Sequence, residues 1–316
     1  MHELPYAGIL CIGDPHLSSR VPGFRKDDYP RVILAKFRWC LDLARRERLL
    51  PIVLGDLFHY PRDNANWLTV ELMRLLEGQM ILTVAGNHDC SENALVDDDT
   101  LSILLAAGRL QLLDRGTWSG TVNGVQIAIG GTSWGRTLPE KVDHAELGDP
   151  RWTLWITHHD IAFADGETFG SAIQCREIPG IDLLINGHIH KSAPAKVCGT
   201  TTWCNPGNIS RIKRSDATRA HVPGALRIDV TPTAWVPTQI VLPHAPFEEV
   251  FHQEIVGDSV ELGESQFIAG LAALQKFKTS GEGLREFLRH NLEQFEDQRV
   301  RDQILALADE VLSDAR

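Results

Sequence analysis

Six short apolar runs, each followed by Gly, Asp, Asn or His, constrain the fold of this chain more than any other feature. They read GILCIGDPH, PIVLGDLFH, MILTVAGNHD, VQIAIGGTSW, TLWITHHD and IDLLINGHIH. Their length and β-branched content are typical of buried strands. Between the first three runs, residues 31–50 and 66–78 carry apolar side chains at helical spacing, and Gly78 is a typical helix stop. Strands that alternate with helices in this way predict a layered α/β fold.

The character of the sequence changes after about residue 205. Residues 224–230 and 238–243 predict a pair of strands. From about residue 261 onward, apolar stripes at helical spacing predict helices, the last of them over residues 300–313. We therefore expect a first domain over residues 1–243 and a mostly helical region over residues 244–316.

Composition argues against two classes of protein. A formal net charge of −11 disfavours a protein that coats nucleic acid through bulk electrostatics. No apolar run approaches the ~18 residues of a membrane span, and the N-terminus lacks the basic and apolar regions of a signal peptide. The six cysteines form no CxxC pair and indicate reduced thiols. We expect a cytoplasmic protein with no membrane partner.

Histidines gather where the predicted strands end. Of the 13 histidines, seven follow apolar runs, namely His16, His59, His88, His158, His159, His188 and His190. The carboxyl ends of strands form the ligand crevice of open α/β sheets, so this placement indicates a site. Any one of these motifs alone is more typical of a turn, since Gly86 and Asn87 are turn formers. Five such motifs in order favour chemistry over turns.

The residue types in these motifs suit divalent metal ions. Carboxylates, imidazoles and an amide oxygen form a ligand set for Mn, Fe or Zn. Two ions ~3.5–4 Å apart would stabilise the attacking and leaving oxygens of a phosphoryl displacement. The ligands available for two ions that share a carboxylate are Asp14, His16, Asp56, Asn87, one of His158 and His159, His188 and His190.

The motifs GDPH, GDLFH, GNHD, THHD and GHIH are similar to the five ordered motifs of the calcineurin-like metallophosphoesterases. Within that superfamily the chain resembles the SbcD-type nuclease subunits of DNA double-strand-break repair, through GDLFH, GNHD, LSILLAAGRLQLL and NPGNISR. The resemblance covers about residues 7–243. It implies an α/β sandwich of two sheets flanked by helices as the catalytic domain, with a C-terminal helical appendage over residues 244–316. The implied activity is hydrolysis of DNA phosphodiester bonds with two divalent ions. Mn²⁺ is the expected ion, and Fe, Zn, Ni and Mg are the alternatives.

The resemblance also implies a role for each motif residue. One ion would be held by Asp14, His16, Asp56 and His190, and the other by Asp56, Asn87, His158 and His188. His158 is preferred over His159 because the family ligand directly ends its strand. His88 would face the scissile phosphate as a catalytic residue, with Asp89 orienting His88 or its loop. His59 stands where the family often has Asp and is left outside the ligand set.

Several weaker sequence signals have both a functional and a purely structural interpretation. Arg20 and Arg25, in the polar loop 18–30, and Arg211 are candidate substrate contacts, but solvated charge explains these stretches equally well or better. Four tryptophans could stack bases, although core packing is favoured for Trp134, Trp152, Trp155 and Trp203. Beyond DNA, the candidate partners are an ATPase, which the resemblance suggests for residues 244–316, and a second copy of the chain. The rival functions are a phosphodiesterase or phosphatase for small nucleotides, and a scaffold that kept the fold without catalysis.

Overall fold

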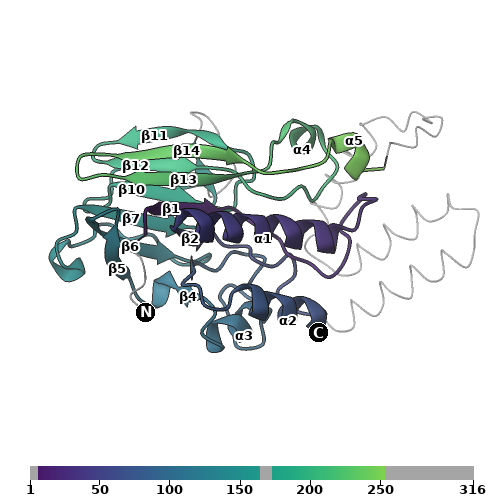
Figure 1. Cartoon of the computed structure of the whole chain (residues 1–316). Coiled ribbons are helices and arrows are strands. Elements are labelled where there is room, and N and C mark those ends of the chain that lie inside the picture. The colour runs from purple at the N-terminus through teal and green to yellow at the C-terminus, as the bar shows by residue number, and fades with distance from the viewer. Residues whose placement is uncertain (1–5, 164–172, 253–316) are drawn as a thin grey trace, which may run out of the picture. The chain divides into compact units, whose positions relative to one another are not determined.

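The apolar runs form the inner strands of two six-stranded sheets (Figure 1). The computed structural model of the chain describes residues 6–163 and 173–252. The first sheet has the order β14 (Trp235–Val241), β13 (Gly224–Val230), β1 (Gly8–Ile12), β2 (Leu49–Val53), β3 (Leu82–Thr83) and β4 (Gln111–Leu112). The second has the order β11 (Ala193–Cys198), β12 (Thr201–Asn205), β10 (Leu183–Asn186), β7 (Trp152–Thr157), β6 (Val125–Thr132) and β5 (Trp118–Val122). A separate parallel pair joins β8 (Ile161–Ala162) to β9 (Ile173–Gln174).

Strand directions bring the predicted site residues to one edge of each sheet. In the first sheet β1, β2, β3 and β4 are parallel, β13 runs antiparallel to β1, and the edge strand β14 runs antiparallel to β13. In the second sheet β6, β7, β10 and β12 are parallel, with β5 and β11 as antiparallel edges. The loops that leave β1, β2 and β3 therefore start from one edge, as do the loops that leave β7 and β10.

Successive side chains of a strand point to opposite faces of the sheet and therefore pack into different hydrophobic cores. Ile9 and Cys11 of β1 join a core that also contains Leu154 of β7 and Leu183 of β10, so this core lies between the sheets. Leu10 of β1 belongs instead to the core under the helices. On the outer face of the second sheet, a third core buries Leu184, Trp203 and neighbouring residues. Strands buried on both faces read as continuous apolar runs, which explains the sequence pattern.

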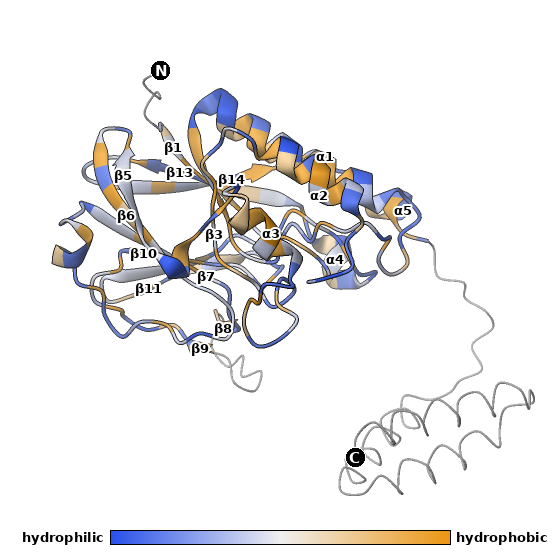
Figure 2. Ribbon diagram, turned by 90° about the horizontal axis from the view of Figure 1, so that it is seen from below, coloured by the Kyte–Doolittle hydropathy of each residue, from blue (hydrophilic) through white to orange (hydrophobic). Residues whose placement is uncertain are grey.

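Helices cover the outer face of the first sheet. The described helices are α1 (Tyr29–Glu47), α2 (Asn66–Leu75), α3 (Thr100–Ala106), α4 (Asp216–Ala220) and α5 (Phe247–Val250), with 3₁₀ turns at Leu113–Arg115 and Ala145–Leu147. Buried residues of α1, α2 and α3 share one core with β1 and β2. Apolar and polar residues alternate along α1 (Figure 2). None of the helices among the described residues is long and apolar enough to cross a membrane.

Helix α1 ends earlier than the sequence predicts. The expected range ran to residue 50, but Arg48 takes a left-handed conformation (φ 55°, ψ 43°) that ends the helix after Glu47. Its backbone N–H bonds to carbonyls of the last turn, and Leu49 and Leu50 already belong to β2. At the other end, the carboxylate of Asp28 accepts a hydrogen bond from the Arg31 N–H, and Pro30 occupies the first turn.

The predicted fold class is confirmed, since two sheets flanked by helices form the described part of the chain. The predicted strand over residues 224–230 is β13, and its partner β14 begins earlier than expected, at Trp235. The described residues lie in one compact unit, Met1–Gln253. The helices predicted from residue 261 onward lie outside the described residues, and the boundary at residue 243 stays a prediction.

Candidate metal centre

Four predicted ligands lie on left-handed turns directly after strands. They are Asp14 (φ 38°), His16 (φ 48°), Asp56 (φ 47°) and His188 (φ 68°). Such a conformation is uncommon for residues with a Cβ and costs about 1–3 kcal/mol each. Strain of this kind persists where the surrounding structure holds a side chain in one required direction, and it concentrates at functional sites.

The first ligand group gathers Asp14, His16, Asp56 and His190, whose ligand atoms all lie within 4.8 Å of one another. His16 Nε2 is 3.0 Å from His190 Nε2 and 3.6 Å from Asp56 Oδ2. Asp14, His16 and Asp56 are buried. These are the four residues that the resemblance assigns to one ion.

The second group gathers Asp56, His158 and His188, again within 4.8 Å. Asn87 Oδ1 lies 3.2 Å from His158 Nε2 and 2.9 Å from His188 Nδ1, so the amide belongs to the same cluster. Asp56 is common to both groups. Asp56 and Asn87 follow strands of the first sheet, whereas the two histidines follow strands of the second.

Hydrogen bonds at the far sides of the imidazoles fix which nitrogens face the cluster. His158 Nδ1 donates to the Leu54 carbonyl at 2.7 Å, and His188 Nε2 donates to Asp160 Oδ1 at 2.9 Å. The remaining nitrogens, His158 Nε2 and His188 Nδ1, converge with Asn87 Oδ1. A cation bound there would take the place of the Nε2 proton of His158, and partners behind the ring are typical of metal-ligating histidines.

Two orphaned atoms support the same interpretation. Asp14 is fully buried, and its Oδ2 has no hydrogen-bond partner among the described residues; the buried His16 Nδ1 has none there either. Burial raises the pKa of Asp14 to about 7, and the opposing charge of His158 does not offset it. Asp14 Oδ1 accepts the His188 backbone N–H at 2.8 Å, but a buried carboxylate whose other oxygen has no donor is costly unless a cation neutralises it. The residue set therefore fits divalent ions.

The pair formed by Asp56 and His158 dominates the electrostatics. Burial alone would raise the pKa of Asp56, yet the charge of His158 holds that pKa well below its usual range. Burial alone would lower the pKa of His158, but the Asp56 carboxylate raises it to about 9. By contrast, burial lowers the pKa of His190 to about 4, which keeps that imidazole neutral and available as a ligand.

The structure distinguishes the adjacent histidines His158 and His159. The ring of His159 turns away from the cluster, because its Nδ1 contacts Thr157 Oγ1 and its Nε2 donates to the Arg136 carbonyl at 2.7 Å. Both of its ring nitrogens are thus occupied elsewhere. His158 Nε2, in contrast, lies 3.3 Å from Asp56 Oδ2. The geometry therefore favours His158 as the ligand.

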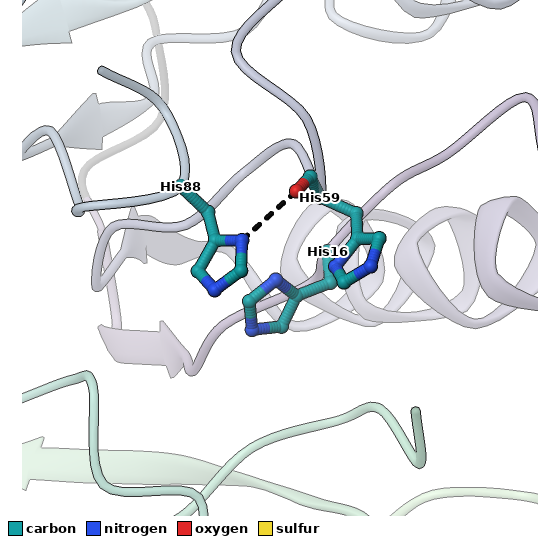
Figure 3. Close-up of side chains that lie close together, drawn as sticks. All are labelled: His16, His59 and His88. Atoms are coloured by element: carbon teal, nitrogen blue, oxygen red, sulfur yellow. Dashed lines mark hydrogen bonds between the residues drawn. The ribbon is translucent and has the colours of Figure 1, made fainter. Parts of the chain in front are cut away.

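His88 lies beside the first ligand group without belonging to it. Its backbone N–H donates to Asp56 Oδ1 at 2.8 Å, and its Nδ1 donates to the His59 carbonyl at 2.9 Å (Figure 3). Its ring stacks on the His59 ring at 5.2 Å and lies 4.8 Å from the His16 ring. Because a carbonyl can only accept, Nδ1 carries the proton, and Nε2 is the nitrogen left for a ligand or a substrate.

Asp89 supports the loops rather than the His88 ring. Its carboxylate accepts hydrogen bonds from the backbone N–H groups of Leu57 (3.3 Å), Phe58 (2.9 Å) and Gly86 (2.9 Å). It is fully buried, and burial raises its pKa to about 7. Of the two roles expected for Asp89, the contacts correspond to positioning of the loop, by tying the segment after β2 to the segment after β3.

The predicted substrate contacts fall into two kinds. Arg20 is exposed, and its guanidinium lies over the Tyr60 ring. Arg25 and Arg211 are buried and serve the protein itself. Arg25 pairs with Asp27 and also donates to the Arg211 carbonyl, while the Arg211 guanidinium donates to the His221 and Ala245 carbonyls. Asp27, two residues after Arg25, is a local sequence signal for charge neutralisation, whereas the contact with the Arg211 carbonyl has no local signal.

Sequence reasoning missed three contacts around the cluster. Asp160 supports His188, Ser210 Oγ donates to the Asp14 carbonyl at 3.2 Å, and the Trp134 ring lies 5.0 Å from the His188 ring. Asp160 ends the THHD motif, so its position could have been read as a partner of the site. Core packing is confirmed for Trp203, which is fully buried. Trp134 instead faces a ligand.

Comparisons with known proteins place the chain in a family. The family model for the calcineurin-like phosphoesterases matches residues 7–192. A search of curated proteins gave no match. Among solved structures, a hypothetical protein from Thermus thermophilus aligns at 15% identity and TM-score 0.40, over 75% of this chain and 100% of its own. The calcineurin-like phosphoesterase YfkN from Bacillus subtilis aligns at 11% identity and TM-score 0.38, over 74% and 90%.

Proposed function

The chain belongs to the calcineurin-like phosphoesterase family, and from that premise we propose that it cleaves DNA phosphodiester bonds with two divalent ions. Membership in the family indicates a metal-dependent phosphoester hydrolase. The observation that carries the two-ion proposal is that Asp56 belongs to two separate groups of ligand atoms. A carboxylate shared in this way is suited to hold two ions at the short separation that phosphoryl displacement requires.

The ligand residues have a defined task in this proposal. One ion would be held by Asp14, His16, Asp56 and His190, and the other by Asp56, Asn87, His158 and His188. When bound, the ions supply Lewis acidity toward the phosphate oxygens and a water nucleophile of lowered pKa. The left-handed turns and the hydrogen bonds that His158 and His188 donate to Leu54 and Asp160 keep the ligand atoms in place beforehand.

His88 supplies the proton chemistry. The His59 carbonyl holds the proton of His88 on Nδ1, so Nε2 is the atom that interacts with substrate. A protonated Nε2 can donate to the leaving alkoxide or to a non-bridging phosphate oxygen. General acid catalysis of this kind contributes typically ~10²–10⁴-fold to rate. Asp89 keeps the loop that carries His88 fixed, through its three backbone hydrogen bonds.

Two features support DNA as the substrate. The first is the resemblance of GDLFH, GNHD and NPGNISR to the SbcD-type nucleases. The second is a cavity of about 410 Å³ beside His88 and His190, whose lining residues in the described part of the chain include no carboxylate. The net charge of −11 favours the rival interpretation, hydrolysis of small phosphoesters, because such substrates need no extended basic surface. A partner ATPase and a homodimer stay predictions.

Incubating the pure protein and Mn²⁺ with labelled single- and double-stranded DNA tests the proposal, with bis(p-nitrophenyl) phosphate beside them. We expect cleavage of DNA that chelation abolishes and that the Asp56→Ala variant lacks. Hydrolysis of the small diester with DNA intact under Mn²⁺, Fe²⁺, Zn²⁺, Ni²⁺ and Mg²⁺ would favour the small-molecule phosphodiesterase. No hydrolysis of either substrate by a protein that binds metal would favour the scaffold.

A further inference from the structure

The cavity beside His88 differs in charge from the rest of this acidic chain. His59, His88 and His190 border it on the side of the ligand cluster, and Lys191, Arg211 and Lys213 contribute positive charge elsewhere on its wall. The whole chain has 42 acidic residues and 31 lysines and arginines, yet no Asp or Glu among the described residues lines this cavity. A cavity with cations and no carboxylate selects for an anionic ligand.

Two of these cations are free to bind a ligand. Arg211 is committed to backbone carbonyls of His221 and Ala245. Lys191 and Lys213 are both exposed, and the structure gives their ammonium groups no hydrogen bond or ion pair within residues 6–163 and 173–252. A lysine ammonium is a point charge with three donors, well suited to a phosphate oxygen.

The cavity wall is fixed relative to the ligand cluster. The backbone N–H of Ile209 donates to the Gly13 carbonyl at 3.1 Å, and Ser210 Oγ donates to the Asp14 carbonyl at 3.2 Å. These two bonds connect the segment that leads to Lys213 with the loop that carries Asp14. Lys191 directly follows the predicted ligand His190. Both lysines are therefore held at the edge of the proposed reaction centre.

The cavity is larger than a single phosphate requires. Its volume of about 410 Å³ lies within the range of ~300–1,000 Å³ that is typical of sites for small organic ligands. Ile189, Ile212 and Ala217 supply apolar lining, and Ser215 and Thr218 supply hydroxyl groups. The apolar surface and the hydroxyl groups could pack against a base and hydrogen-bond to a sugar, and the two ammonium groups could pair with a second phosphate.

We propose that this cavity binds the nucleotide next to the scissile bond, and that Lys191 and Lys213 contact the second phosphate of that nucleotide. The inference rests on the proposed phosphodiesterase function and narrows its substrate class. The preferred substrate is a phosphodiester that carries a further phosphate one nucleotide away, as in an oligonucleotide. An isolated diester fills the reaction centre and leaves the two lysines without an anion.

Dinucleotides that differ only in a terminal phosphate test the proposal. The dithymidine monophosphate TpT has one phosphate, whereas pTpT and TpTp each add one, at the 5′ or the 3′ end. Affinity is measured by competition with a fluorescent oligonucleotide on Mn²⁺-loaded full-length protein carrying His88→Asn, which should slow turnover by ~10²–10⁴-fold. We expect pTpT or TpTp to bind about tenfold more tightly than TpT, the size of one charge-assisted hydrogen bond.

The lysines are tested by a double variant, Lys191→Gln with Lys213→Gln, in the same protein. We expect the double variant to remove the gain from the terminal phosphate and to leave the affinity for TpT unchanged. Lys141→Gln, at an exposed lysine outside the cavity lining, is the matched control and should keep the gain. Equal affinity for all three dinucleotides, or a gain that survives in the double variant, would overturn the inference.

Hydrolysis of bis(p-nitrophenyl) phosphate by the chain with His88 intact separates this inference from the proposed function. That small diester cannot reach the two lysines with a second phosphate, so its hydrolysis by the wild-type chain tests the proposed function independently of the lysines. A protein that binds pTpT through the lysines but hydrolyses no diester would refute the proposed function alone. A protein that hydrolyses the small diester but shows no gain from a terminal phosphate would refute only the second-phosphate site.

Discussion

His158 Nε2 and Asp56 Oδ2 lie 3.3 Å apart although they come from different sheets. Asp56 follows β2 of the first sheet, and His158 follows β7 of the second. Their contact closes the gap between the two sets of loops, so the packing of the sheets itself assembles the ligand cluster. Both residues are buried, and the pair is costly to separate because each would leave an uncompensated charge behind. Fold and metal centre are therefore coupled.

Asp56→Ala should abolish binding of both ions, because the carboxylate of Asp56 belongs to both ligand groups. Loss of a residue that only supports a ligand costs ~10–100-fold in metal affinity, so loss of a shared ligand should cost more than about 100-fold. Titration calorimetry with Mn²⁺ and elemental analysis of the dialysed protein measure the effect. Asp98→Ala, at an exposed carboxylate, is the control. Wild-type metal content in Asp56→Ala would refute the bridging role.

Gly86→Ala should displace Asp56 without replacing any predicted ligand. A Cβ at position 86 would lie 2.1 Å from Asp56 Oδ1 and 2.4 Å from its backbone nitrogen, closer than atoms can approach. We expect weakened metal binding, together with a loss of about 1–3 kcal/mol of folding stability from overpacking. Metal titration and urea denaturation measure the two effects. Gly116→Ala is the matched control, because its Cβ would meet nothing within 4 Å. Equal metal affinity in both variants would contradict the close approach.

The sequence could predict that these side chains lie close together, because the signal for it is local. Each ligand follows a buried strand, and parallel strands must end at the same edge, so position along the chain translates into position in space. The outcome for Arg25 could not be foreseen in the same way. Asp27 lies only two residues from Arg25, but the Arg211 carbonyl lies 186 residues away, and no local pattern decides whether the guanidinium binds it or a substrate. Ring orientation in His158 and His159 likewise depends on Leu54 and Arg136, which no local pattern specifies.

Acid should destabilise the fold partly through His221. Burial lowers the pKa of His221 from 6.5 to about 4, and its Nε2 donates to the Asn208 carbonyl at 3.0 Å. Between pH 6.5 and 4 the unfolded chain therefore binds a proton that the folded chain does not, so stability is full above pH 6.5 and falls as pH decreases. Because the imidazole is partly exposed, we expect a contribution of only about 1 kcal/mol between pH 7 and 5.

Urea denaturation of wild type and His221→Gln at pH 7 and pH 5 measures that contribution. The variant loses the hydrogen bond to Asn208 and should be less stable than wild type at pH 7. Its further loss of stability on acidification should be smaller than that of wild type, because glutamine does not titrate. His244→Gln, at an exposed histidine, should keep the wild-type pH dependence. An identical pH dependence in His221→Gln would show that His221 titrates normally in the folded protein.

His88→Asn should separate catalysis from metal binding. The His88 side chain is not needed by either group of predicted ligands, and its backbone bond to Asp56 Oδ1 survives the substitution. We therefore expect wild-type metal content and fold, with single-turnover cleavage of DNA slower by ~10²–10⁴-fold, the usual effect of losing an acid–base group.

An ester with a good leaving group, such as bis(p-nitrophenyl) phosphate, distinguishes the two roles open to His88 Nε2. If His88 protonates the leaving oxygen, this ester should lose far less rate than DNA does. If His88 instead stabilises the non-bridging oxygens, both substrates should lose rate equally. His16, His59 and His88 also place ligand atoms within 4.8 Å of one another, so loss of metal from the variant would make His88 a ligand. An unchanged rate would show that His88 only forms part of the turn.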